Sequence, residues 1–153
     1  MYRKILVALE NSRADESLLP HVAELARLAG SQLLLLHVAD GFAAQHFDNL
    51  KLAESEEMRG DREYLETAAA GLRAQGLDVV TQLALGDPPT EILKAAEREQ
   101  CDLIAMTGHG HRGLADVIFG STITPVRHAS RIPLLVVRAE KTGTRKIARK
   151  ETT

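Results

Sequence analysis

Four short, nearly continuous apolar runs constrain the fold of this chain more than any other feature. They occupy residues 5–9, 33–38, 103–106 and 134–137. A strand that is apolar at successive positions is covered on both faces, as in a parallel sheet between two layers of helices. A weaker run at residues 79–85 mixes in polar side chains, which is typical of an edge strand.

The segments between these runs have the periodicity of helices. Leu18, Val22 and Ala26 recur at helical spacing after the first run. Residues 52–72 carry a second amphipathic pattern, and Asp87 before two prolines is typical of the start of a third helix. Alternating strands and helices predict an α/β fold, with a single open, doubly wound parallel sheet of about five strands and helices on both faces.

Length and composition fit one soluble domain. The chain has 153 residues, of which 44% are hydrophobic and 26% charged. We expect the domain to span residues 1–139 and residues 140–153 to form a basic, disordered tail. The formal net charge of -2 offers no general attraction for nucleic acid. The sequence lacks both a run of about 18 apolar residues and a secretory signal, so we predict a cytoplasmic protein without a membrane span.

A glycine-punctuated loop is predicted to begin at Thr107, directly after the third apolar run. Nine residues separate Gly110 from Gly120, which is followed by Ser121 and Thr122. Glycine lets the backbone approach a ligand closely, and free N–H groups at the carboxyl edge of a sheet often bind phosphate. The spacing predicts two backbone turns that face one another and hold a phosphate. The alternative is a glycine-rich loop and helix cap without a ligand.

Because of Pro125, the sequence allows two different starting residues for the next helix. A helix that begins at Ser121 would meet this proline too deep in its first turn. Thr124 could instead cap a helix whose first residue is Pro125, with Ser121 and Thr122 in a turn or a short preceding helix. In that case phosphate binding requires that their N–H groups still converge.

With its loops at the carboxyl ends of the strands, the chain resembles the universal stress protein family over residues 2–138. The last part of the family's ATP-binding pattern, Gly-x2-Gly-x9-Gly-Ser/Thr, is matched by Gly110, Gly120 and Ser121. The chain departs from the family at several positions: Thr107 stands at the first glycine, with Gly108 displaced by one residue, Glu10 replaces the usual Asp, and Pro125 is also unexpected. The other matching segments are residues 4–12, 36–38, 86–88 and 102–106.

The resemblance implies a strand order of 3-2-1-4-5, homodimerisation through the last strand and a role in stress resistance. It also implies that the chain binds ATP, with Mg²⁺ or Mn²⁺, or that it binds AMP or another adenine nucleotide. Carried over by position, the binding residues are Ala8, Glu10 and Val38 around adenine and ribose, Met106 and Thr107 beside the nucleotide, and His109, Gly110, Gly120, Ser121 and Thr122 near the phosphates. The predicted function is a homodimeric, nucleotide-binding regulator, with an unidentified protein as a further partner.

Two other functions stay open. The first is a ligand-free dimeric interaction module, in which the glycines only shape the loop. The second is metal binding by His109 and His111 together with His128 or His37, although two imidazoles do not complete a zinc site. The sequence has no complete Walker A motif and no evident base to activate water, so we expect no catalysis beyond slow ATP hydrolysis.

Overall fold

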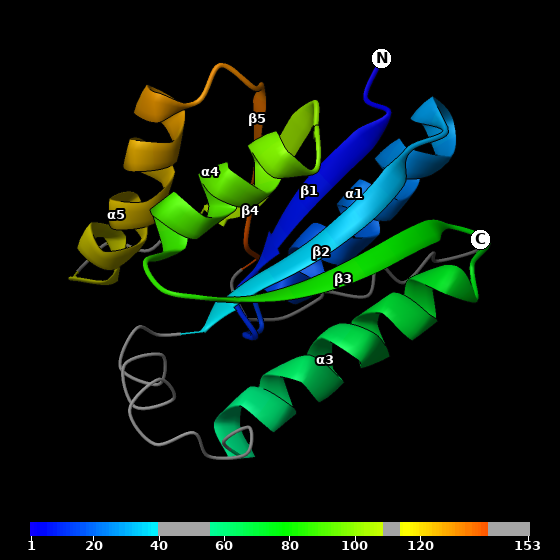
Figure 1. Cartoon of the computed structure of the whole chain (residues 1–153), viewed down its shortest axis with the longest axis horizontal. Coiled ribbons are helices and arrows are strands. Elements are labelled where there is room, and N and C mark those ends of the chain that lie inside the picture. The colour runs from blue at the N-terminus through cyan, green and yellow to red at the C-terminus, as the bar shows by residue number, and fades with distance from the viewer. Residues whose placement is uncertain (40–55, 109–113, 141–153) are drawn as a thin grey trace, which may run out of the picture.

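Strands and helices alternate along the chain, as Figure 1 shows for the computed structural model. The structure describes residues 1–39, 56–108 and 114–140 and, within residues 114–121, the backbone alone. The strands are β1 (Lys4–Leu9), β2 (Gln32–Ala39), β3 (Asp78–Leu85), β4 (Leu103–Gly108) and β5 (Leu134–Arg138). The helices are α1 (Asp15–Ala29), α3 (Glu56–Arg73), α4 (Pro88–Arg98) and α5 (Leu114–Ala129).

The five strands form one parallel sheet in the order β3-β2-β1-β4-β5. This confirms the predicted fold class and strand order. At the centre, Val7 of β1 is paired with Leu35 of β2 and with Ala105 of β4. The chain leaves β1 toward β2 on one side and reaches β4 on the other, so the strand order reverses between β1 and β4.

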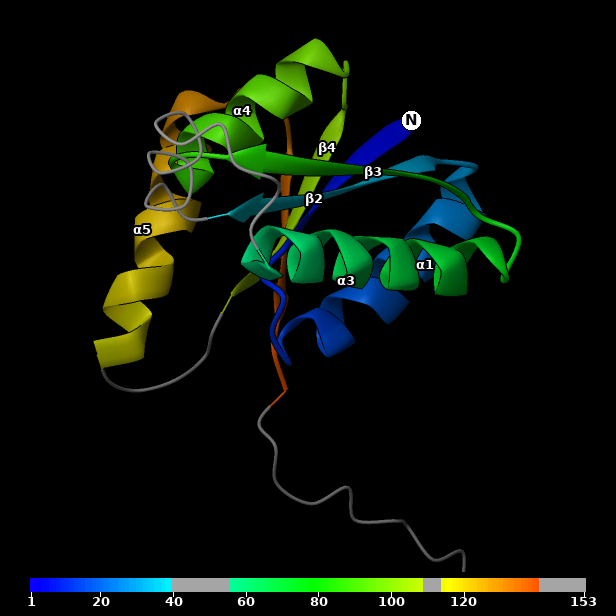
Figure 2. The same cartoon turned by 60° about the horizontal axis from the view of Figure 1, so that its bottom comes forward.

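Two apolar cores lie on opposite faces of the sheet. Successive residues of β1 point to opposite faces, so that Val7 packs with α1 and α3 whereas Leu6 packs with α4 and α5. Figure 2 shows α1 and α3 together on one side of the sheet and α4 and α5 on the other. Leu18 and Leu65 anchor the first pair of helices, and Val126 belongs to the core under the second. Because both faces are covered, the strands tolerate continuous apolar sequence.

Strand β4 is longer than its apolar run. It continues through Thr107 and Gly108, which are paired with Val137 and Arg138 of β5. The predicted loop therefore begins two residues too early at Thr107. A Cβ atom added to Gly108 would lie 2.7 Å from Cγ1 of Val136, so the close packing of β5 requires glycine here.

Helix α5 corrects both proposed starts for the helix around Pro125. It runs without interruption from Leu114 to Ala129, so Gly120, Ser121 and Thr122 lie inside it, and Gly120 forms no turn of its own. Pro125 cannot donate the usual helical hydrogen bond. The packing of Val126 and Ile123 against the sheet offsets this loss.

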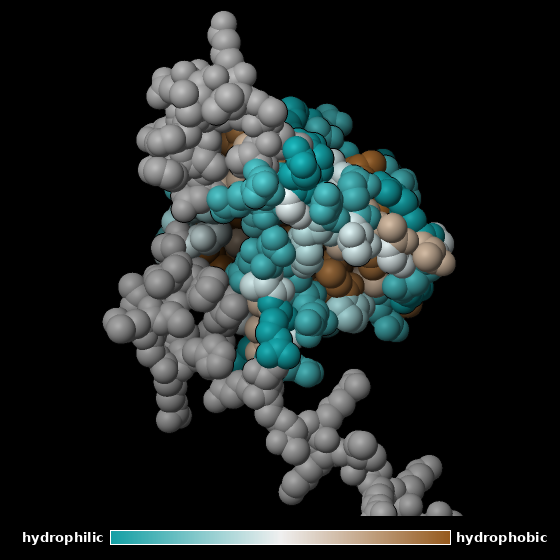
Figure 3. All heavy atoms as spheres, turned by 90° about the horizontal axis from the view of Figure 1, so that it is seen from below, coloured by the Kyte–Doolittle hydropathy of each residue, from teal (hydrophilic) through white to brown (hydrophobic). Residues whose placement is uncertain are grey.

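The sheet has two outer strands, β3 and β5. On β5, Val136 is 45% exposed. Viewed from below relative to Figure 1, the coloured surface is mostly hydrophilic, with separate apolar patches (Figure 3). In the ranges that the structure describes, no helix has both the length and the apolarity needed to cross a membrane. The predicted tail lies almost entirely outside those ranges.

Candidate functional site

A cavity of about 420 Å³ opens where the carboxyl ends of β1, β2 and β4 meet. This is the point at which the strand order reverses, and in open α/β sheets ligands bind at that place. The volume is within the range of pockets for small molecules. The cavity is lined by Ala8, Leu9, Glu10, Ser12, Leu36, His37, Val38, Pro88, Ile92, Met106, Thr107, Thr122 and Ile123.

Most of the predicted binding residues meet at this cavity. Those that line it are Ala8, Glu10, Val38, Met106, Thr107 and Thr122. Gly120 and Ser121 directly precede Thr122 on α5. His109 and Gly110 lie outside the described residues. Residues from strand ends that are far apart in the chain, which the sequence analysis grouped together, therefore lie around one cavity.

The carboxylate of Glu10 is held on two sides within the cavity. The Ser12 hydroxyl donates to Oε2 over 3.0 Å, and the Thr107 hydroxyl donates to Oε1 over 3.2 Å. Thr107 is buried, and its bond joins the end of β1 to the neighbouring strand β4. The cavity thus carries a fixed anionic acceptor beside apolar walls.

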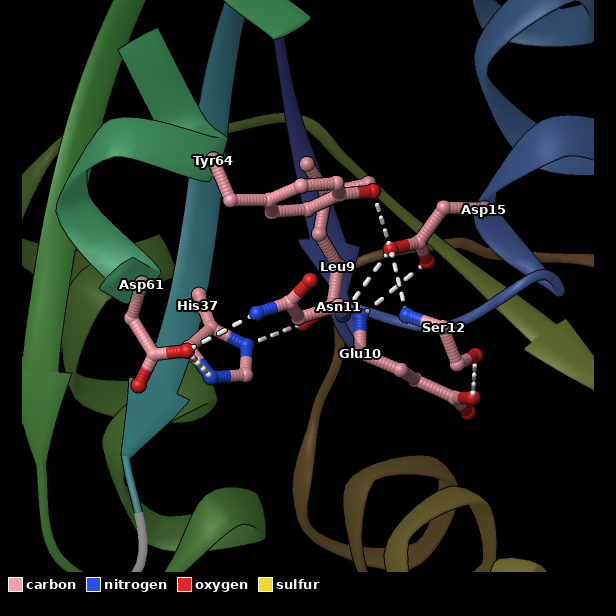
Figure 4. A network of polar contacts seen from close by, with 8 residues as sticks. All are labelled: Leu9, Glu10, Asn11, Ser12, Asp15, His37, Asp61 and Tyr64. Carbon is pink, nitrogen blue, oxygen red and sulfur yellow. Dashed lines mark hydrogen bonds and ion pairs between the residues drawn. The ribbon is translucent and has the colours of Figure 1, made fainter. Parts of the chain in front are cut away.

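The loop after β1 folds around the side chain of Asp15. Its carboxylate accepts hydrogen bonds from the backbone N–H groups of Glu10 over 3.0 Å, Asn11 over 2.9 Å and Ser12 over 3.4 Å. The Tyr64 hydroxyl donates to the same carboxylate over 2.6 Å. Figure 4 shows these groups converging from β1, α1 and α3.

His37 connects the cavity to α3 through a second set of contacts. Its Nδ1 lies 2.8 Å from the carbonyl oxygen of Leu9, and its Nε2 lies 3.5 Å from Oδ1 of Asp61. The Asn11 amide donates to the same Asp61 oxygen over 2.9 Å (Figure 4). The ring is thus held at the end of β2 by contacts on both of its nitrogens.

The metal hypothesis gains no support from the described part of the chain. Among the residues described there, no group of three or more His, Cys, Asp or Glu side chains could hold a metal ion. His109 and His111, on which the hypothesis depended, lie outside those residues.

The family model of the universal stress protein family matches residues 1–138. The chain belongs to this family. It is 32% identical to the universal stress protein MJ0577 of Methanocaldococcus jannaschii, over 90% of this chain and 96% of that protein. A solved structure of MJ0577 has a TM-score of 0.76 at 31% identity and covers 94% of this chain and 99% of that one.

Two further universal stress protein structures share the fold and contain a nucleotide. The protein from Archaeoglobus fulgidus in complex with dAMP has a TM-score of 0.67 at 23% identity, over 89% of this chain and 98% of that one. The protein from Arabidopsis thaliana with AMP bound has a TM-score of 0.64 at 19% identity, over 94% of this chain and 97% of that one.

The polar residues that brace this universal stress protein's site were missed at the sequence level. Asp61 and Tyr64 lie on α3, for which the sequence indicated an amphipathic helix but no polar contacts with the site. A signal was nevertheless present, because Asp61 falls on the same helix face as the buried residues Met58 and Leu65. Asp15 likewise stands three residues before Leu18 on the buried face of α1.

Proposed function

We propose that this universal stress protein binds an adenine nucleotide at the carboxyl ends of β1, β2 and β4 and acts as a regulator in the stress response. The observation that carries the proposal is the cavity at the reversal of strand order, lined by most of the residues predicted for nucleotide binding. The nucleotides bound by the Archaeoglobus and Arabidopsis proteins support an adenine ligand.

The lining suits the parts of a nucleotide. Adenine is flat and largely apolar at its faces, and the side chains of Ala8, Val38 and Met106 offer apolar contacts. The Glu10 carboxylate can accept hydrogen bonds from ribose hydroxyls, as an acidic residue does in dinucleotide-binding folds. The proposed phosphate contacts are His109, Gly110, Gly120, Ser121 and Thr122. We propose ATP, with Mg²⁺ or Mn²⁺, as the ligand, and AMP as the main alternative.

One observation favours a second candidate, the ligand-free interaction module. Gly120 lies in the interior of α5, where a backbone N–H normally bonds to the preceding turn of the helix. A phosphate held by this N–H requires that the helix begin later when ligand is bound. If it does not, the glycines serve only the local fold.

Calorimetry on folded protein stripped of nucleotide separates these candidates. We expect ATP and AMP to bind, with ATP tighter because the glycine segment contacts its added phosphates, and GTP to bind more weakly. If neither adenine nucleotide binds at millimolar concentration, the nucleotide proposal is wrong and the ligand-free interaction module is favoured. Equal affinities for AMP and ATP would keep the adenine site but remove the phosphate role of the glycine segment.

The proposed regulator is a cytoplasmic homodimer that pairs through β5 and recognises a further protein. The open edge of β5 supports the dimer, because its unpaired backbone groups can extend the sheet into a second copy. Hydrolysis of ATP, if measured, should be slow.

A further inference from the structure

Asp15 is a buried carboxylate whose partners all belong to one small region. Its side chain is 1% exposed, and it accepts three hydrogen bonds from the consecutive backbone N–H groups of residues 10–12. The carboxylate also lies in the first turn of α1, where the helix dipole stabilises negative charge. Asp15 therefore fixes the backbone of the loop from which Glu10 and Ser12 extend into the cavity.

Tyr64 holds Asp15 from the other side. Its hydroxyl donates to Oδ2 of Asp15 over 2.6 Å, although the two residues are 49 positions apart in the chain. Burial, together with the hydrogen bond to Asp15 and the charge of that residue, raises the pKa of Tyr64. The shift extends to higher pH the range in which the hydroxyl keeps its proton and remains a donor to Asp15.

A second contact ties α3 to the same loop. The Asn11 amide donates to Asp61, which is one turn before Tyr64 on α3. Asn11 has a positive φ of 58°, a conformation that asparagine adopts more readily than most residues. Figure 4 shows Asp61 pointing to Asn11 of the loop and Tyr64 pointing to Asp15, whose carboxylate faces the loop. Helix α3 thus contacts the loop directly through Asp61 and indirectly through Tyr64, which bonds to Asp15 of α1. Glu10 and Ser12 of the loop line the cavity.

From this arrangement we infer that Asp15 and Tyr64 are positioning residues, which hold Glu10 and Ser12 in the geometry that a ligand in the cavity meets. The hydrogen bond between Tyr64 and Asp15 also links the position of α3 to ligand affinity. If the loop adopts its binding conformation only part of the time, the apparent affinity is reduced by that fraction. The effect on ligand binding rests on the proposed function, whereas the ordering of the loop by Asp15 and Tyr64 does not depend on it.

The test is the variant Tyr64→Phe, which removes one hydroxyl and keeps the ring. Amide hydrogen exchange, followed by NMR, should become about tenfold faster at Glu10, Asn11 and Ser12, since a hydrogen bond to a charged group is lost. The affinity for AMP, measured by calorimetry, should fall by about threefold or more.

Two control variants separate positioning from a general loss of stability. Tyr2→Phe removes the chain's other tyrosine hydroxyl, before the amino-terminal end of β1 and so away from the cavity. Leu72→Val trims a buried residue near the far end of α3, which lowers global stability without touching the loop. Neither control should raise exchange selectively at residues 10–12.

The outcomes distinguish the two proposals. Unchanged exchange at residues 10–12 in Tyr64→Phe, or an equal change in Leu72→Val, overturns the positioning role. Faster exchange in Tyr64→Phe supports that role even if the wild type binds no AMP, a result that would overturn the nucleotide proposal alone. If Asp15→Asn folds, combining it with Tyr64→Phe should give a smaller effect than the sum of the two, because both act through one hydrogen bond.

Discussion

The Thr107 hydroxyl donates a hydrogen bond to the Glu10 carboxylate over 3.2 Å, from β4 to the end of the neighbouring strand β1. Both residues depart from the family pattern that the sequence resembles. These two departures therefore form one feature of the site, since the Thr107 hydroxyl holds the longer Glu10 side chain by a hydrogen bond.

The contribution of this pair can be measured with Thr107→Val, which keeps the branched shape and removes the hydroxyl. We expect the free energy of unfolding to fall by about 1 kcal/mol, the usual net value of one hydrogen bond. Urea unfolding measures this change. Thr107→Ser keeps the hydroxyl and should retain the bond to Glu10. A valine variant as stable as the wild type would show that the pair contributes nothing to folding.

A larger effect is expected from Asp61→Ala on α3. The residue is 8% exposed, and removal of its carboxylate leaves the Asn11 amide without its acceptor and His37 without its partner at Nε2. We expect a loss of about 2–3 kcal/mol in urea unfolding, because buried polar groups would lose their bonds. Glu63→Ala makes a similar change on the exposed face of the same helix and should cost little. Equal effects of the two variants would contradict the structural role of Asp61.

Sequence patterns predicted the fold well because continuous apolar runs identify the strands locally. The runs at residues 33–38 and 103–106 are apolar at nearly every position, and the structure buries the strands that contain them between two helical layers. The convergence of Glu10, Val38 and Met106 also followed from topology, since parallel strands end at the same edge of the sheet.

The hydrogen bonds of Asp15, Asp61 and Tyr64 around the loop after β1 could not be predicted in the same way. A carboxylate on an amphipathic helix is usually exposed, and its burial depends on donors that are distant in sequence. Asp61 finds its donor 50 positions away in Asn11, and Tyr64 finds its acceptor 49 positions away. Helix α5 was misjudged for a related reason, because the penalty of Pro125 is local whereas the compensating burial of Val126 is tertiary.

Cys101 should be nearly inert in the folded protein. Burial raises the pKa of its thiol from 9.0 to about 11, so at pH 8 the reactive thiolate is about hundredfold scarcer than in the unfolded chain. We expect labelling by a disulfide reagent to be correspondingly slower under native conditions than in urea. Equal rates in the two conditions would contradict this environment.

The same shift makes stability depend on pH. Between pH 9 and 11 the unfolded chain has lost the thiol proton while the folded protein keeps it, so the free energy of unfolding falls as pH rises. Urea unfolding across this range should show a shallower decline for Cys101→Ala than for the wild type. An identical decline would mean that the thiol does not contribute.

The dimer proposed for β5 is tested by Val136→Pro. Ile104 donates its N–H to Pro133 and Ala139 donates to Gly108, and because a strand's residues alternate in direction, the N–H of Val136 points to the open edge. Proline there removes a donor from the outer side and keeps the bonds to β4. Light scattering should show a weaker dimer, whereas Val136→Thr should dimerise normally. A wild type that is monomeric at micromolar concentration would overturn the proposal.

The two candidate roles of Gly120 are separated by Gly120→Ala. In the interior of a helix such as α5, alanine is more stable than glycine by about 1 kcal/mol, so the nucleotide-free variant should gain stability in urea unfolding. If the Gly120 backbone contacts phosphate, the added methyl group should weaken ATP binding and leave AMP binding nearly unchanged.

Gly71→Ala is the matched control for that comparison. Gly71 lies on α3, and a Cβ atom there would meet nothing within 4 Å. The control should therefore gain similar stability with no change in affinity for ATP or AMP. A selective loss of ATP affinity in Gly120→Ala alone supports a phosphate contact at α5. Unchanged ATP affinity in both variants would assign Gly120 to the helix and move the phosphate site elsewhere along the cavity.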